Sequence, residues 1–123
     1  MQYISIDGDD IGKKITSYYL SNDLEKLREI SNKLKCSTEN IANFLKEMGF
    51  TIVFCAADGV VAYIDKAVDF NLLFKEINSI SPTNMTFSMG VGFSLREAYI
   101  ALLASKSNGK NCMYLYQDIG VVK

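Results

Sequence analysis

The chain has 123 residues, of which 49% are hydrophobic, so we expect residues 1–123 to form one domain with a buried core and no second domain. Thirteen Lys and Arg balance fourteen Asp and Glu, which excludes a strongly basic surface, and we expect no direct DNA binding. No signal-peptide pattern follows Met1, and no apolar run approaches the roughly 20 residues that cross a bilayer. We therefore expect a soluble cytoplasmic protein without a membrane partner.

The sequence contains no histidine, and its three cysteines, Cys36, Cys55 and Cys112, are widely spaced. An odd number of scattered cysteines argues against both a zinc site and a disulfide framework, so we expect reduced thiols. Without histidine the usual general base at neutral pH is missing, and neither a Ser-His nor a Cys-His nucleophile pair can form. Catalysis assisted by a metal ion remains open.

The N-terminal part of the chain predicts one strand followed by helices. Residues 3–6 form a short apolar strand that ends in the acidic turn Asp7-Gly8-Asp9-Asp10, and a short helix is expected over residues 11–20. Residues 23–48 carry the apolar spacing of one long helix or of two helices joined near the middle. Gly49 suits the position just after a helix end, because glycine readily adopts the left-handed backbone conformation found there.

The middle of the chain predicts a hairpin, a helix and another strand. Apolar stretches on both sides of Asp58 predict a hairpin over residues 50–65 with this acid at its tip. Residues 67–77 show the helical spacing of apolar side chains, and residues 86–93 alternate strictly between large apolar and small side chains. The strand over residues 86–93 should therefore have one crowded and one open face.

The C-terminal part predicts a last helix and a short last strand. The helix is expected over residues 95–108, and the strand over residues 113–116. The open face of the preceding strand includes Gly90 and Gly92, which either admit a nucleotide base against the sheet or permit close packing of a helix. We favour helix packing.

The order of these elements predicts an α+β fold of the ferredoxin-like palm type. The expected order is βααββαβ followed by αβ, and a split βαβ unit built around a hairpin is the ferredoxin-like arrangement. Such a sheet is mainly antiparallel, with its helices on one face. Because the first strand then lies antiparallel to the third, Asp7 at the end of the first strand should lie beside Asp58 at the hairpin tip.

Two neighbouring carboxylates without Cys or His ligands prefer a hard cation such as Mg²⁺, which takes one or two carboxylates together with waters and substrate phosphates. This is the starting point of a nucleotidyl-transfer site, where a metal pair ~4 Å apart activates a hydroxyl and stabilises the leaving pyrophosphate. Each acidic segment also has a purely structural interpretation, as a turn and helix cap for Asp7-Gly8-Asp9-Asp10 and as a tight turn for Asp58. Together with the topology, the functional interpretation is the stronger one.

Three segments, taken in order, resemble the minimal CRISPR polymerases, which are small relatives of the GGDEF diguanylate cyclases and of the Cas10 palm domain. Residues 3–15 (YISIDGDDIGKKI) are similar to the first cyclase motif, in which an Asp ends a strand and a second Asp follows after one residue. Residues 56–60 (AADGV) are similar to the signature hairpin. Residues 89–92 (MGVG) and 104–111 (ASKSNGKN) resemble the stretch where a lysine at a helix end reaches substrate phosphates.

The resemblance implies roles for the acidic turns. Asp7 and Asp58 would bind the metal ions, Mg²⁺ or Mn²⁺, and the carbonyl of Gly8 would add a ligand. Asp9 or Asp10 would support the second metal ion. Asp7, Asp58 and Asp9 are therefore the candidate catalytic residues, and Gly8 and Asp10 are candidate nucleotide-binding positions.

The resemblance also implies that Lys106 clamps the triphosphate. Lys110 is a further candidate, although a lysine beside a glycine turn is equally well explained as a solvated loop residue. Ala56 and Ala57 replace the paired glycines of the larger family, and Gly59, which should line the same site, replaces its second acid. With one carboxylate fewer facing the metals, a weakened or inactive catalyst is an open alternative.

The implied activity is condensation of nucleoside triphosphates, ATP favoured, into a cyclic dinucleotide or short cyclic oligonucleotide by two-metal phosphoryl transfer, in bacterial antiphage defence. Because each domain would bind one nucleotide, ring closure implies a homodimer or higher homo-oligomer, and the messenger would act on a separate effector. Two alternatives stay open. One is a haloacid dehalogenase-like phosphatase in which Asp7 is phosphorylated and Asp9 is its acid, and the other is a non-catalytic nucleotide-binding module, which Gly59 and the alanine pair favour.

Overall fold

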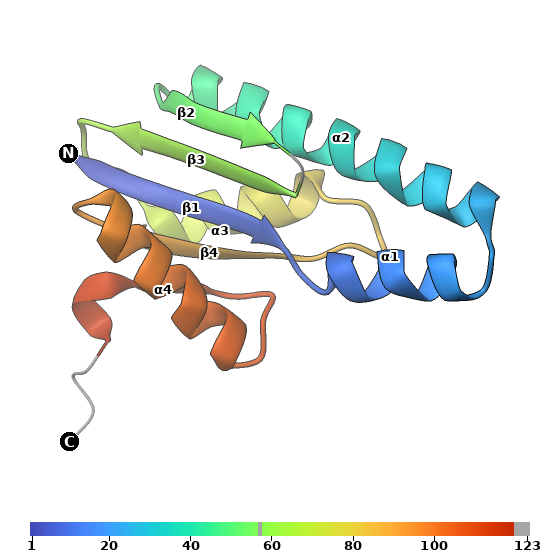
Figure 1. Ribbon diagram of the computed structural model, residues 1–123. Coiled ribbons are helices and arrows are strands. Elements are labelled where there is room, and N and C mark those ends of the chain that lie inside the picture. The colour runs from blue at the N-terminus through green and yellow to red at the C-terminus, as the bar shows by residue number, and fades with distance from the viewer. Residues whose placement is uncertain (57, 120–123) are drawn as a thin grey trace.

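A five-stranded sheet in the order β2-β3-β1-β4-β5 forms the centre of the part of the chain that the computed structural model describes, residues 1–56 and 58–119 (Figure 1). Neighbouring strands are antiparallel except for β4 and β5, which are parallel. The strands are β1 (Gln2–Gly8), β2 (Thr51–Ala56), β3 (Gly59–Ile64), β4 (Phe87–Gly92) and β5 (Met113–Leu115).

The helices follow the predicted order with small changes at their ends. They are α1 (Ile11–Leu20), α2 (Leu24–Glu47), α3 (Phe70–Ile80) and α4 (Leu95–Ser107), and a short 3₁₀ turn (Tyr116–Asp118) follows β5.

Of the two possibilities for residues 23–48, the structure has the single long helix, α2. The side chain of Asp23 accepts a hydrogen bond from the backbone N–H of Lys26 at 3.0 Å and caps its start. Gly49 follows its end with φ of 103°, as predicted. Helix α3 begins three residues later than expected, because Asp69 caps it through the N–H of Leu72.

The alternation of β4 separates two layers. Phe87, Met89 and Val91 point into the main core, which α2 and α3 complete on one face of the sheet. The small residues of β4 point to the other face, where α4 packs. The buried apolar side chains that helices add to the core are Ile11 of α1, Ile30, Leu34, Ile41, Ala42 and Leu45 of α2, and Phe70, Leu73 and Ile77 of α3.

Close packing of α4 explains the two glycines of β4. A Cβ atom on Gly90 would lie 2.1 Å from the backbone nitrogen of Leu102 and 2.3 Å from the carbonyl oxygen of Ala98. A Cβ atom on Gly92 would lie 2.4 Å from the Cβ of Glu97. Since helix backbone fills this space, the small face of β4 packs a helix and does not hold a base.

The predicted α+β palm class and the predicted order of elements along the chain are confirmed, but the helices do not all lie on one face. Figure 1 shows α4 on the near side of the sheet and α3 on the far side. Helix α4 connects the parallel strands β4 and β5, and the small face of β4 gives it room to pack. The position of α4 places the end of this helix on the same face of the sheet as the side chain of Asp7.

None of the helices in the described ranges is long and apolar enough to cross a membrane.

Candidate functional site

The acidic turn after β1 lies directly beside the hairpin tip. Asp7 pairs in register with Gly59, and the N–H of Gly8 donates a hydrogen bond to the carbonyl of Asp58 at 2.8 Å. A Cβ atom on Gly8 would lie 3.6 Å from the Cβ of Asp58. The antiparallel pairing of β1 and β3 thus brings together two acids from distant parts of the sequence, as the topology predicted.

These acids lie at the polar end of an apolar groove between the β2–β3 hairpin and α4. The groove has a volume of about 800 Å³, and Asp7, Asp58 and Lys106 contribute to its lining. Several apolar residues of its walls, including Phe54 and Tyr99, are more than half exposed. The apolar lining comes mainly from Val53, Phe54, Val61, Leu95, Tyr99, Leu102 and Leu103.

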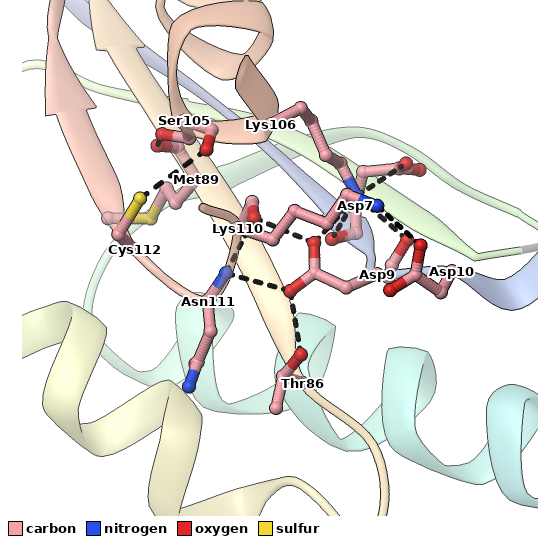
Figure 2. A network of polar contacts seen from close by, with 12 residues as sticks. Asp7, Asp9, Asp10, Thr86, Met89, Ser105, Lys106, Lys110, Asn111 and Cys112 are labelled. Atoms are coloured by element: carbon pink, nitrogen blue, oxygen red, sulfur yellow. Dashed lines mark hydrogen bonds and ion pairs between the residues drawn. The ribbon is translucent and has the colours of Figure 1, made fainter. Parts of the chain in front are cut away.

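Lys106 reaches from the last turn of α4 into the acidic turn (Figure 2). Its Nζ lies 2.8 Å from the carbonyl oxygen of Gly8, 2.8 Å from Oδ1 of Asp9 and 3.3 Å from Oδ2 of Asp7. The lysine side chain is only 22% exposed. Three successive residues therefore surround one ammonium group with oxygen atoms.

Asp9 is buried and fully engaged with hydrogen-bond donors. The hydroxyls of Thr86 and Ser88 donate to its two carboxylate oxygens at 2.7 Å each, and the N–H of Asn111 donates at 2.9 Å. Lys106 is the fourth donor, and 3% of the Asp9 side chain is exposed. A carboxylate has about four acceptor positions. In this arrangement Asp9 has no free position for a metal ion.

The surroundings of Asp7 and Asp9 shift the pKa values of these two carboxyl groups in opposite directions. Burial, reinforced by the negative charge of Asp58, raises the pKa of Asp7, and Lys106 offsets this only in part. Burial would also raise the pKa of Asp9, but the hydrogen bonds that it accepts from Lys106, Ser88 and the other two donors outweigh burial and lower it. The surroundings of Asp7 therefore disfavour its ionised form, whereas those of Asp9 favour its ionised form.

Asp10 belongs to a separate exposed pair. Its backbone is left-handed, with φ of 59°, and its side chain makes no cap hydrogen bond to α1. Its Oδ1 pairs with Lys110 and lies 3.8 Å from the Nζ of Lys13. The hydrogen bond from Lys110 lowers the pKa of Asp10. The structure therefore gives the two candidate lysines different partners, and Lys110 is engaged with a surface acid.

The donor set can be compared with what Mg²⁺ requires. Within residues 1–56 and 58–119, no group of three or more Asp, Glu, Cys or His side chains gathers in a way that could hold a metal ion. Mg²⁺ needs only one or two protein carboxylates when substrate phosphates and waters complete its shell. Asp7, Asp58 and the Gly8 carbonyl supply such a set, and the ammonium of Lys106 already lies against Asp7 and Gly8 as a stand-in cation. The residues fit a Mg²⁺ ion that is bound together with a substrate.

The position of the missing second acid is close to Asp7. A Cβ atom on Gly59 would lie 3.2 Å from the carbonyl oxygen of Ile6 and 3.4 Å from Oδ1 of Asp7. A side chain here would crowd that carboxylate, so glycine keeps its surroundings open. Ala57, one of the two alanines that replace the paired glycines, lies outside the described residues.

Sequence reasoning missed the residues that hold Asp9 and the end of α4. Ser88 belongs to the small face of β4 and Thr86 directly precedes this strand, and hydroxyls there were a readable but weak sign of a polar partner. Asn111 acts through its backbone N–H, which no side-chain pattern reveals. Ser105 donates a hydrogen bond to the carbonyl of Met89 at 2.9 Å and fixes α4 beside β4.

Solved structures of diguanylate cyclase domains have a similar fold. The GGDEF domain of DgcB from Caulobacter crescentus, solved in complex with c-di-GMP, is 13% identical with a TM-score of 0.70, over 95% of this chain and 78% of that chain. The active GGEEF domain of a diguanylate cyclase from Vibrio cholerae is 15% identical with a TM-score of 0.62, over 94% of this chain and 81% of that chain. At these identities the likeness shows the fold.

The comparison with curated proteins finds no match. The family model described as the minimal CRISPR polymerase domain matches residues 3–116, which include the acidic turn, the hairpin tip and Lys106. The chain therefore belongs to the minimal CRISPR polymerase (mCpol) family, and its domain is a palm of the nucleotidyl cyclase type.

Proposed function

We propose that this protein is a nucleotidyltransferase that condenses nucleoside triphosphates, with ATP favoured, into a cyclic dinucleotide or short cyclic oligonucleotide. The observation that supports this most is the position of Asp7 beside Asp58, where β1 pairs with the start of β3, with Lys106 next to them at the end of a groove. Such a site offers negative charge for cations, positive charge for phosphates and apolar surface for a nucleoside.

The reaction would be attack of a ribose hydroxyl of one nucleotide on the α-phosphorus of another. A bond forms between the hydroxyl oxygen and phosphorus, the hydroxyl proton passes to a carboxylate or water, and the bond to the bridging oxygen breaks to release pyrophosphate. A second attack closes the ring. Because the transferred group gains little covalent help from the protein, positioning and charge carry such reactions.

Each residue of the site has a part in this proposal. Asp7 and Asp58, with the carbonyl of Gly8, would hold Mg²⁺ or Mn²⁺, which when bound supplies activation of the hydroxyl and charge neutralisation. Lys106 would contact the phosphates of the substrate. Asp9 would position the surrounding residues and would not bind metal, since hydrogen-bond donors already occupy its carboxylate oxygens.

The groove would receive the nucleoside part of the substrate. Phe54 of β2 and Tyr99 of α4 present exposed rings on its walls, and bases stack on aromatic rings with little regard to sequence. Because most of the lining is apolar, few groups are available to tell one base from another. The preference for ATP therefore rests on the family and not on the groove.

Formation of a ring needs two bound nucleotides, and the groove beside Asp7 and Asp58 suits one. We therefore propose that two copies of the chain face each other, as a homodimer or within a larger homo-oligomer. Family membership supports a role in antiphage defence, in which the product acts on a separate effector protein.

The test is incubation of purified protein with ATP, GTP and their mixture in Mg²⁺ or Mn²⁺, followed by mass spectrometry of the products. The wild type should give a cyclic product, and Asp7→Ala and Asp58→Ala should each lose it. Folded wild-type protein that binds nucleotide but makes no product with any combination would contradict the proposal.

One alternative gains some support, and one loses it. A non-catalytic nucleotide-binding module is favoured by Gly59, where the larger family has an acid, and by the engagement of Lys106 with Asp7. A haloacid dehalogenase-like phosphatase needs a doubly wound sheet, whereas this sheet is mainly antiparallel. The same assay distinguishes the two remaining functions, the cyclase and the non-catalytic nucleotide-binding module.

A further inference from the structure

The ammonium group of Lys106 lies in the place where a cation would bind. It contacts the Gly8 carbonyl at 2.8 Å and Oδ2 of Asp7 at 3.3 Å, and these are two of the three groups that we propose as metal ligands. Figure 2 shows the lysine reaching toward Asp7 and Asp9 from α4. A metal ion on the same oxygens would meet a second positive charge at contact distance, so the two cannot share the cage.

The backbone that carries Lys106 is held firmly, which confines any movement to its side chain. The neighbouring Ser105 is completely buried and donates to the carbonyl of Met89, which ties the end of α4 to β4. The lysine side chain is long and can rotate about several bonds. The ammonium can therefore leave the cage without any change in the helix.

The network behind the cage survives the departure of the lysine. Asp9 keeps three donors without it, the hydroxyls of Thr86 and Ser88 and the N–H of Asn111. A buried carboxylate left with no donor would oppose the movement, but one with three short hydrogen bonds does not. Asp9 also gives the ammonium an anchor at 2.8 Å about which it can turn away from Asp7.

We propose that Lys106 is a resident cation of the metal cage, and that it exchanges Asp7 and Gly8 for substrate phosphate when metal and nucleotide bind. This inference rests on the proposed function, because it takes Asp7 and Gly8 as cation ligands. Its consequence is that metal alone binds weakly and that metal and triphosphate each strengthen the binding of the other. Coupling of this kind is reciprocal.

The first test compares Mn²⁺ binding to the wild type, to Lys106→Met and to Lys13→Met, measured by electron paramagnetic resonance without nucleotide. Lys106→Met should bind Mn²⁺ about tenfold more tightly than the wild type, within the range usual for coupled sites. Lys13→Met removes the same charge from an exposed side chain that pairs with Asp10, and its affinity should stay close to that of the wild type. Equal or weaker Mn²⁺ binding by folded Lys106→Met would overturn the proposal.

The same substitution should have the opposite effect on phosphate. Tripolyphosphate binding in the presence of a chelator, measured by calorimetry, should be weaker for Lys106→Met than for the wild type. A lysine with a merely structural role would move both affinities in the same direction or neither. Loss of tripolyphosphate binding without any gain in Mn²⁺ binding would contradict the exchange.

A measurement on the wild type covers the case in which Lys106→Met does not fold. Acylation of lysines by a succinimidyl ester, quantified by mass spectrometry, should be faster at Lys106 when Mn²⁺ is bound, relative to Lys13 in the same sample. An unchanged rate at saturating Mn²⁺ would overturn the proposal. These measurements need no turnover, so they can succeed or fail independently of the assay for a cyclic product.

Discussion

Two carboxylates at the end of β1, Asp7 and Asp9, are separated by one residue and lie in opposite environments. Asp7 is 35% exposed, faces the groove and Asp58, and has a raised pKa. Asp9 is 3% exposed, lies behind the strand ends among four donors, and has a lowered pKa. The fold therefore leaves the charge of Asp7 poorly neutralised, whereas it uses Asp9 as a structural junction that connects neighbouring elements.

The comparison between Asp7 and Asp9 indicates that a small palm domain can assign cation binding and structural support to two different carboxylates. A carboxylate kept in an unfavourable setting gains most from a bound cation, and perturbed groups of this kind gather at functional sites. A carboxylate with every acceptor position filled gains nothing from a further cation, but it can fix the strands and the lysine around it. The following predictions test whether Asp7 and Asp9 really differ in this way.

The largest effect is expected on activity at Asp7. Asp7→Asn should lower the rate of product formation roughly a thousandfold, equivalent to about 4 kcal/mol of transition-state stabilisation, because our proposal makes Asp7 a metal ligand. The initial rate of product formation from ATP, followed by chromatography, measures this loss of activity. Asp65→Asn makes the same chemical change at an acid that is 80% exposed, and it should leave the rate unchanged.

The next effect is expected on stability at Asp9. Asp9→Asn should lower the free energy of unfolding by about 2–4 kcal/mol, because an amide NH₂ would replace an acceptor among buried donors and beside Lys106. Urea denaturation followed by circular dichroism measures this, with Asp65→Asn again as the control. If Asp9→Asn unfolded at the wild-type midpoint, the junction role of Asp9 would be wrong.

A smaller effect is expected from the groove that Asp7 faces. Tyr99→Ala should weaken ATP binding by about 1–3 kcal/mol, the usual cost of removing a ring on which a base stacks. Tripolyphosphate, which has no base, should bind Tyr99→Ala as it binds the wild type, as calorimetry can show. Parallel losses for both ligands would place the base elsewhere, and a change of oligomeric state in Tyr99→Ala would assign the groove to a second copy of the chain.

The smallest effect is the dependence of stability on pH, and the two acids should contribute with opposite signs. A lowered pKa means that the contribution of Asp9 is present above the unfolded pKa, near 3.8, and is lost as the pH falls through the folded value below it. The raised pKa of Asp7 means that its contribution is lost as the pH rises through the window above 3.8. Unfolding free energies of Asp7→Asn and Asp9→Asn between pH 3 and pH 7, each relative to the wild type, should therefore diverge as the pH rises.

The sequence predicted which acids would meet but not what each would contact. Hydrophobic periodicity and element order predict the β1–β3 pairing, and that pairing alone brings Asp7 to Asp58. By contrast, Asp9 and Asp10 are indistinguishable in the sequence as members of one acidic turn. The left-handed backbone of Asp10 separates them, leaving one buried and one exposed.

The face on which α4 lies was also beyond the sequence pattern. The glycines of β4 were correctly interpreted as a packing surface, but they do not indicate which element packs there. Burial of Asp9 depends on Thr86 and Ser88, which are distant in the sequence and become neighbours only through the β1–β4 pairing. Local patterns predict elements, whereas these contacts arise from the assembled sheet.

The most direct test of the division between Asp7 and Asp9 is a thermal-shift measurement with Mn²⁺ and α,β-methylene-ATP, which cannot release pyrophosphate. The melting temperature of the wild type should rise when both are added, because ligands that bind the folded state stabilise it. Asp9→Asn should start from a lower melting temperature and still rise, whereas Asp7→Asn should start near the wild type and show little rise. A full rise in Asp7→Asn together with none in Asp9→Asn would contradict the account and make Asp9 the metal ligand.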